Sequence, residues 1–175
     1  SFRAPMYKNA SGALLRARLV SAAEVNFILA EAALKGYAVG DAKTFYENGV
    51  KASLSTWGVG SNSTAYLANA GVAFDGSVKQ VIEQKWIASW TAATEAWFDF
   101  RRTGFPELKA GPVAKRQAIP VRFYYMQDEL RINAKNTAAA LDKLEVTNYS
   151  QADGKNSAWS KPWIIQGTGK RSEEH

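Results

Sequence analysis

The feature that most constrains the fold is a long helical pattern that ends at three separate stop signals. Ser77 with Gln80 resembles the capping box that begins a helix. The end is marked by two basic residues, a glycine just past the last turn and a proline soon after, Arg101, Arg102, Gly104 and Pro106. Between these ends, residues at Val78, Val81, Ile82, Lys85, Trp86, Trp90, Ala93 and Trp97 recur at steps of three or four, and all but the lysine are apolar or aromatic. The sequence therefore predicts one long helix.

An earlier part of the chain predicts a pair of helices. From residue 22 to 35 the apolar positions have helical spacing, on a face made by Val25, Ile28, Leu29, Ala32 and Ala33, and Gly36 ends the pattern. Asp41 is placed to cap a second helix, with a face of Ala42, Phe45, Tyr46, Gly49 and Val50. This pattern is typical of a tetratricopeptide-type pair. Because a lone repeat cannot bury its face, we expect the chain to be a fragment of a longer protein.

The remaining segments predict short helices and irregular structure. Residues 55–76 indicate a loop-rich connection with a short helix near Ala65. Residues 109–128 indicate irregular or short extended structure, and a final helix is expected from about Asn133. Strong β alternation is absent from the sequence. We therefore expect a mostly α fold over residues 1–175, with the tetratricopeptide-like pair at 22–55 and the long helix and an irregular C-terminal lobe at 56–175.

Composition argues against several kinds of site. The chain has no cysteine and a single histidine, His175, so we expect no thiol chemistry, no metal site and no cofactor. A net charge of +6 raises nucleic acid as a partner, but the positive charges are scattered among carboxylates and no nucleic-acid motif accompanies them. No hydrophobic run approaches the roughly 20 residues of a membrane span. We expect no nucleic-acid binding and no membrane-spanning segment.

Two groups of charged residues are candidates for a catalytic or an anion-binding site. Glu95 and Asp99 lie four apart on one helix face, as a pair of glycosidase carboxylates could. The favoured interpretation is structural, because Lys85, Arg101 and Arg102 offer charge partners for carboxylates among aromatics. The two arginines could bind an anion, but arginines in a last turn also interact favourably with the helix dipole.

The aromatic residues divide by their surroundings. Trp86, Trp90 and Trp97 have helical spacing, which favours a place in the core. Trp57, Tyr66 and Trp159 lie in polar or glycine-rich surroundings, and we expect them to be the candidates for stacking against a sugar.

The order of these segments resembles the C-terminal part of the SusD/RagB-like proteins, in the branch described as starch-binding and outer-membrane-associated. The most specific matches are RRTGFPEL and IPVRF, which follow AEVNFILAEAALKG, ASLSTWG and VIEQKWIA. Met126 stands where the family commonly has proline, and Lys161-Pro162-Trp163 replaces a more usual tryptophan pair. The resemblance extends from about Glu24 to Trp163.

This resemblance implies a function. Family members are non-enzymatic lipoproteins on the outer face of the outer membrane, where they capture glycans or other nutrients for a TonB-dependent transporter barrel. It implies an all-α fold, and a lipid anchor outside this chain as the link to the membrane. Their ligand residues follow no motif that can be carried over. The matching residues, which the resemblance implies fasten the long helix to its neighbours, are Gln84, Lys85, Trp86, Trp97, Arg101 and Arg102. A carboxylate-based glycosidase and a helical-repeat protein-interaction module remain the alternatives.

Overall fold

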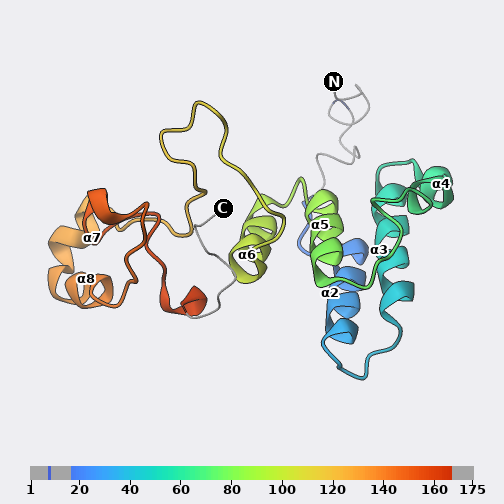
Figure 1. Cartoon of the computed structure of the whole chain (residues 1–175), viewed down its shortest axis with the longest axis horizontal. Coiled ribbons are helices and arrows are strands. Elements are labelled where there is room, and N and C mark those ends of the chain that lie inside the picture. The colour runs from blue at the N-terminus through green and yellow to red at the C-terminus, as the bar shows by residue number, and fades with distance from the viewer. Residues whose placement is uncertain (1–7, 9–16, 167–175) are drawn as a thin grey trace. The chain divides into compact units, whose positions relative to one another are not determined.

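A computed structural model describes residue 8 and residues 17–166, and the chain divides into two compact units, residues 1–100 and 101–175. Within the described residues the regular structure is helical, apart from one antiparallel β-bridge between Glu145 and Lys161 (Figure 1). This confirms the predicted mostly α fold class.

The first unit is built on a helical hairpin and a third helix. Helices α2 (Ala22–Leu34) and α3 (Ala42–Thr56) pack along each other, and α5 (Val78–Ala88) packs on both (Figure 1). Each helix begins at a side-chain cap, from Ser21, Asp41 and Ser77. Thr44 donates to Asp41 through its side chain and its backbone, and these bonds hold the pKa of the Asp41 carboxyl below its usual value. The predicted caps at Asp41 and Ser77 are confirmed.

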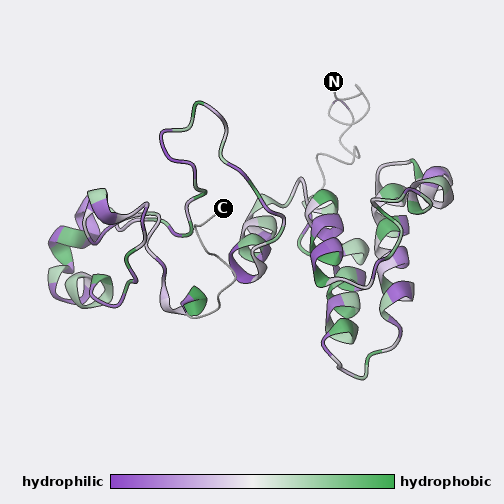
Figure 2. Cartoon of the chain, in the orientation of Figure 1, coloured by the Kyte–Doolittle hydropathy of each residue, from purple (hydrophilic) through white to green (hydrophobic). Residues whose placement is uncertain are grey.

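The core of the first unit lies between these three helices and centres on two aromatic rings. Phe27 of α2 and Tyr46 of α3 meet edge to face, with ring centroids 6.0 Å apart. Both are fully buried, together with Ala23, Ala30, Val50 and Val81. Helices α2, α3 and α5 each carry hydrophobic and hydrophilic stretches (Figure 2), and the hydrophobic cluster joins them.

The predicted apolar face of α2 is wrong at Val25 and Ile28, while its other residues, Leu29, Ala32 and Ala33, are half-buried. Val25 and Ile28 are about half exposed, at 44% and 48%, whereas Ala23, Phe27 and Ala30 are buried. Because apolar residues surround most of this helix, their spacing alone could not identify the packed face. Phe27 determines which face of α2 is packed, because its ring lies against Gly49 of α3. A Cβ atom on Gly49 would lie only 2.9 Å from that ring, so glycine is what allows this close approach.

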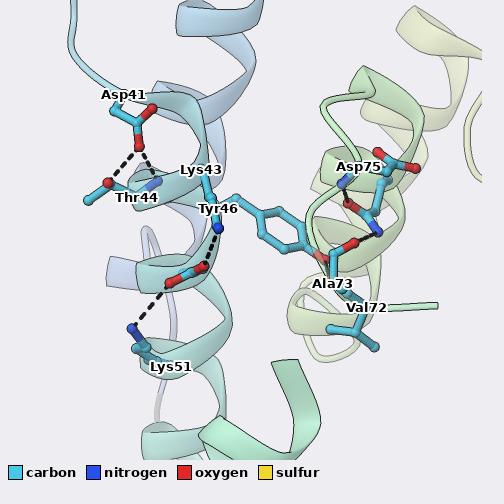
Figure 3. A network of polar contacts seen from close by, with 10 residues as sticks. Asp41, Lys43, Thr44, Tyr46, Lys51, Val72, Ala73 and Asp75 are labelled. Atoms are coloured by element: carbon cyan, nitrogen blue, oxygen red, sulfur yellow. Dashed lines mark hydrogen bonds and ion pairs between the residues drawn. The ribbon is translucent and has the colours of Figure 1, made fainter. Parts of the chain in front are cut away.

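A small polar network closes the core beside α5 (Figure 3). The Tyr46 hydroxyl donates to the carbonyl of Val72 across 2.5 Å, and burial raises the pKa of Tyr46. The Gln80 side chain accepts from the backbone N–H of Asp75 at 2.9 Å and donates to the carbonyl of Ala73 at 2.8 Å. Gln80 therefore fixes the loop before α5 and does not return to Ser77 as a full capping box would.

The predicted single long helix is two helices. Helix α5 ends at Ala88 and α6 (Ala93–Thr103) begins after a turn at residues 89–92, where Ala92 donates to the carbonyl of Ser89 at 2.7 Å. Ser89 and Thr91 are weak helix formers, so the local sequence gives the helix little support at the break. The predicted end is confirmed, because α6 stops at Thr103 and Gly104 adopts a φ of 81°.

Between α3 and α5 lie the 3₁₀ turn η1 (Gly60–Asn62) and the short helix α4 (Ser63–Leu67), which confirms the helix predicted near Ala65. In the second unit, α7 (Gln127–Ile132) and α8 (Ala134–Leu141) lie between irregular segments, with 3₁₀ turns η2 (Gln151–Asp153) and η3 (Trp163–Ile165). The sequence reasoning found α8 and missed α7.

The interior of the second unit is largely polar. Val121 and Ile165 are its buried aliphatic side chains among the described residues, beside the buried hydroxyl residues Thr137, Thr147, Ser150, Ser157 and Ser160. Asn156 pairs with the backbone of Tyr125, accepting from its N–H at 2.8 Å and donating to its carbonyl at 2.9 Å. Hydrogen bonds between polar groups therefore stabilise the second unit, whereas apolar burial stabilises the first.

Candidate functional site

Two tryptophans form an aromatic pair at the surface of the first unit. Trp57 is the C-cap of α3 and Trp90 lies in the turn after α5. Their ring centroids are 4.9 Å apart with planes inclined at 44°, within the range preferred by aromatic pairs. Trp57 is half-buried and Trp90 is 44% exposed. The pair therefore presents indole surface to solvent on two fixed chain turns.

Arg18 adds a positive charge to this pair. Its guanidinium carbon lies 4.3 Å from the centroid of the Trp57 ring, which is cation–π geometry. Because Arg18 covers part of Trp57, most of the accessible indole surface of the pair belongs to Trp90. The sequence reasoning placed Trp90 in the core, and that expectation is wrong; its neighbours Ser89 and Thr91 were the signal that the helix ends before it.

Tyr66 lies at the edge of the core of the first unit. It belongs to α4 and is half-buried against the core cluster. Its hydroxyl donates to the side-chain oxygen of Gln84 at 3.2 Å. This contact fixes the orientation of the ring and links α4 to α5, so Tyr66 has a structural partner as well as a partly open ring.

Trp159 belongs to the second unit, where it is held from two sides. Its indole N–H donates to the carbonyl of Ala118 at 2.9 Å, and the Arg116 guanidinium stacks on its ring at 4.2 Å. Arg116 forms a two-pronged ion pair with Asp153, which also accepts from the Ser157 hydroxyl at 2.7 Å. The three predicted sugar-stacking residues are therefore divided between the units, with Trp57 and Tyr66 in the first and Trp159 in the second.

The Arg116–Asp153 contact gives the second unit a defined response to acid. Hydrogen bonds from Arg116, then from Ser157, lower the pKa of Asp153 to about 2, from an ordinary value of 3.8. A carboxyl with a lowered pKa in the folded state contributes stability above its unfolded pKa and loses it as the pH falls through the folded pKa.

We therefore expect the melting temperature of the wild type to fall between pH 4 and pH 2 by more than that of Asp153→Asn. The drop should be small, because an exposed ion pair is worth little. Asp128→Asn, which changes an exposed carboxylate 3.8 Å from Arg131, is the matched control and should follow the wild type. Parallel curves for the wild type and Asp153→Asn across this window would contradict the assignment.

The paired carboxylates are not arranged as a glycosidase pair. Asp99 is buried and accepts from the Lys85 ammonium at 2.7 Å, whereas Glu95 is exposed. On one continuous helix Lys85 and Asp99 would lie about 21 Å apart along the axis, at roughly 1.5 Å per residue. The turn at residues 89–92 brings them together, and the predicted lysine partner for this carboxylate is confirmed.

The other family-matching residues lie in different environments. Gln84 and Lys85 are buried, Trp97 is half-buried, and Trp86 is 40% exposed, so the expected buried tryptophan stripe is wrong at Trp86 as well as at Trp90. Burial lowers the pKa of the half-buried Arg101, and its neighbour Arg102 is exposed in the same helical turn.

The described residues contain no cluster of histidine, cysteine, aspartate or glutamate that could hold a metal ion. Among the helices in the described ranges, none combines the length and the apolar character that a membrane crossing requires.

The sequence was compared with known families and structures. Residues 4–126 match the profile of a SusD-like family described as "Starch-binding associating with outer membrane". A search of curated proteins gave no match.

Solved structures of SusD-like proteins resemble this chain. A SusD-like protein of the Bacteroidetes is 28% identical with a TM-score of 0.72, over 89% of this chain and 32% of its own. A chitin-binding SusD homolog from Flavobacterium johnsoniae is 27% identical with a TM-score of 0.69, over 91% of this chain and 39% of its own. A SusD-like protein from Bacteroides thetaiotaomicron is 29% identical with a TM-score of 0.68, over 86% and 37%.

The chain thus spans about a third of the length of these structures. The family profile, in contrast, covers well over half of the 175 residues. This chain belongs to the SusD-like family, whose members are described as starch-binding and associated with the outer membrane.

Proposed function

We propose that this chain is part of a non-enzymatic protein that binds a glycan or another nutrient at the outer-membrane surface and delivers it to a TonB-dependent transporter. The observation that carries the proposal is the match over residues 4–126 to a family described as starch-binding and associated with the outer membrane. A chitin-binding SusD homolog among the similar structures also supports a glycan as the ligand. Within this proposal, residues 1–175 are the C-terminal part of a SusD-like domain, and a lipid anchor outside them provides the attachment to the membrane.

The chemistry of the first unit supports binding rather than hydrolysis. A carboxylate that serves as a general acid must carry a proton that it can donate to the leaving group. Asp99 instead accepts from a buried lysine at 2.7 Å, and its neighbour Glu95 points into solvent-exposed surroundings. The ion pair with Lys85 suits a carboxylate that holds two helices together.

Exposed indole rings on ordered turns indicate where the sugar stacks in this proposal. We propose the Trp57–Trp90 pair as a stacking surface, because its ring separation of 4.9 Å and the 44% exposure of Trp90 leave an apolar platform open. Trp159 is the corresponding candidate in the second unit, and Tyr66 contributes an edge of its ring beside Gln84.

Calorimetric titration of the chain with maltohexaose and chitohexaose tests the proposal. We expect one of these oligosaccharides to bind, and the double change Trp57→Ala/Trp90→Ala to weaken binding about tenfold or more, as truncation of central tryptophans does in other interfaces. Phe98→Ala is the control, since it removes an aromatic ring that is 45% exposed in the same unit. No detectable affinity for any glycan would count against the proposed function, and unchanged affinity in the double variant would move the site elsewhere.

The same samples distinguish the hydrolytic alternative. Chromatography of the oligosaccharides after long incubation should show no shortened products. Shortened products that disappear in Asp99→Asn would support a glycosidase and overturn the non-enzymatic proposal.

A further inference from the structure

The second unit carries the positive charge of this protein. Residues 101–166 contain eleven lysines and arginines against six aspartates and glutamates, whereas residues 17–100 contain six against eight. Four of the six acidic residues of the second unit already have a basic partner, in the pairs Arg116–Asp153, Arg131–Asp128, Lys155–Asp142 and Lys161–Glu145. Further lysines are exposed and have no ion pair within the described residues, among them Lys135 and Lys143. An anionic ligand would therefore be attracted to this unit.

The backbone of one of these lysines, Lys143, is hydrogen-bonded to the turn that begins at the most exposed tryptophan side chain in the described residues. Trp163 is 78% exposed at the start of η3. The Gln166 side chain, at the end of the same turn, donates to the carbonyl of Lys143 at 2.9 Å and to that of Lys161 at 2.8 Å. We call Lys143, Glu145, Lys161, Trp163 and Gln166 the Trp163 corner.

The backbone of this corner is fixed although its indole is exposed. Glu145 and Lys161 exchange two backbone hydrogen bonds, at 3.0 and 2.9 Å, and their side chains form an ion pair at 3.2 Å. Ile165 is buried and its N–H donates to the carbonyl of Pro162 at 3.0 Å. A ligand that stacks on Trp163 would therefore find its turn already ordered, which reduces the entropy cost of binding.

The local charge of the corner is positive. Lys161 and Glu145 neutralise each other, and the adjacent Asp142 is paired with Lys155, so Lys143 supplies the net charge. An exposed flat ring, on a turn whose Gln166 is bonded to the backbone of an exposed lysine, suits a sugar ring that carries a carboxylate, because the ring stacks while the charge pairs.

We propose that the Trp163 corner binds an acidic glycan, with Trp163 stacking on a uronic acid ring and Lys143 pairing with its carboxylate. This inference rests on the proposed glycan-binding function and assigns it a ligand class and a second site, in a unit different from that of the Trp57–Trp90 pair. A second copy of this chain could also cover an exposed indole, and the test below distinguishes that outcome.

The test is titration of the chain with a galacturonic acid hexamer and with the same hexamer fully methyl-esterified, which removes the charge and keeps the rings. We expect tighter binding of the acidic hexamer, and a difference that shrinks as salt is raised, because exposed charges are screened. Lys143→Gln should weaken binding of the acidic hexamer roughly three- to fivefold, the size of one exposed charge contact, and leave the ester unaffected. Lys135→Gln, an exposed lysine of α8 in the same unit, is the matched control and should change neither.

The indole is tested in parallel. Trp163→Ala should weaken binding of both hexamers, Trp163→Phe should retain most of the affinity, and Phe123→Ala, which removes a ring that is 81% exposed in the same unit, should have no effect. Circular dichroism confirms that each variant is folded. Equal affinity for the acidic and esterified hexamers, or equal losses from Lys143→Gln and Lys135→Gln, would overturn the proposal.

Two further outcomes are informative. Binding of polyglutamate as tight as that of the acidic hexamer, with no effect of Trp163→Ala, would reveal simple charge attraction and overturn the proposal. Self-association that disappears in Trp163→Ala would assign the indole to a contact between copies and overturn it too. If neutral oligosaccharides bind and the acidic hexamer does not, this inference fails while the proposed function stands. If no glycan binds at all, the proposed function fails.

Discussion

Replacing Lys85 with methionine is expected to destabilise the first unit by about 3–5 kcal/mol, because it leaves the carboxylate of Asp99 buried without its lysine. The two side chains are 7% and 11% exposed, and their charged atoms are 2.7 Å apart. Methionine has a similar volume to the lysine stem, so the loss reports the missing charge and not a cavity. Urea unfolding followed by tryptophan fluorescence measures the change.

The control for this prediction is a lysine at the surface of the same unit. Lys51 is 48% exposed and lies 3.6 Å from Glu47, so Lys51→Met should cost no more than about 0.5 kcal/mol. The double change Lys85→Met/Asp99→Leu removes both charges and should recover most of the lost stability, since a buried ion pair contributes little over an apolar pair. A double variant as unstable as Lys85→Met alone would show that the loss has another cause.

The fold class and most helix ends could be predicted because they depend on local chemistry. Asp41 and Ser77 cap helices through hydrogen bonds to residues three positions away, and Gly104 ends α6 through its own φ angle. Such signals act within one turn, so the sequence shows them directly. The match of these segments to the SusD-like family confirms that their order is also characteristic.

The packed faces and the surface aromatics could not be predicted in the same way. The break at residues 89–92 brings together Lys85 and Asp99, and their ion pair is a tertiary contact that helical spacing does not reveal. Once the helix is broken, Trp90 leaves the predicted apolar stripe and meets Trp57 instead. A spacing argument assumes an unbroken helix, so it placed Trp90 in the core.

Shortening Phe27 to alanine tests the choice of packed face on α2 and is expected to cost about 3–5 kcal/mol. Phe27 is 1% exposed and meets both the Tyr46 ring, at 6.0 Å between centroids, and the backbone of Gly49. Ile28→Ala is the matched control: this neighbour belongs to the face that the sequence predicted to be buried, yet it is 48% exposed, so its change should cost well under 1 kcal/mol. Similar losses in the two variants would contradict the packing described here.

A substitution at Gly49 tests the same contact from the other helix, α3. Gly49→Ala alone places a methyl group 2.9 Å from the Phe27 ring, and overpacking of this kind typically costs about 1–3 kcal/mol. In the Phe27→Ala background the ring is absent, so the added methyl group meets open space and the higher helix propensity of alanine should make the change neutral or favourable. The two substitutions should therefore be strongly non-additive, as expected of residues in direct contact. Additive losses would mean that α2 and α3 do not approach each other at this point. The packing described for the helix pair of the first unit would then be wrong.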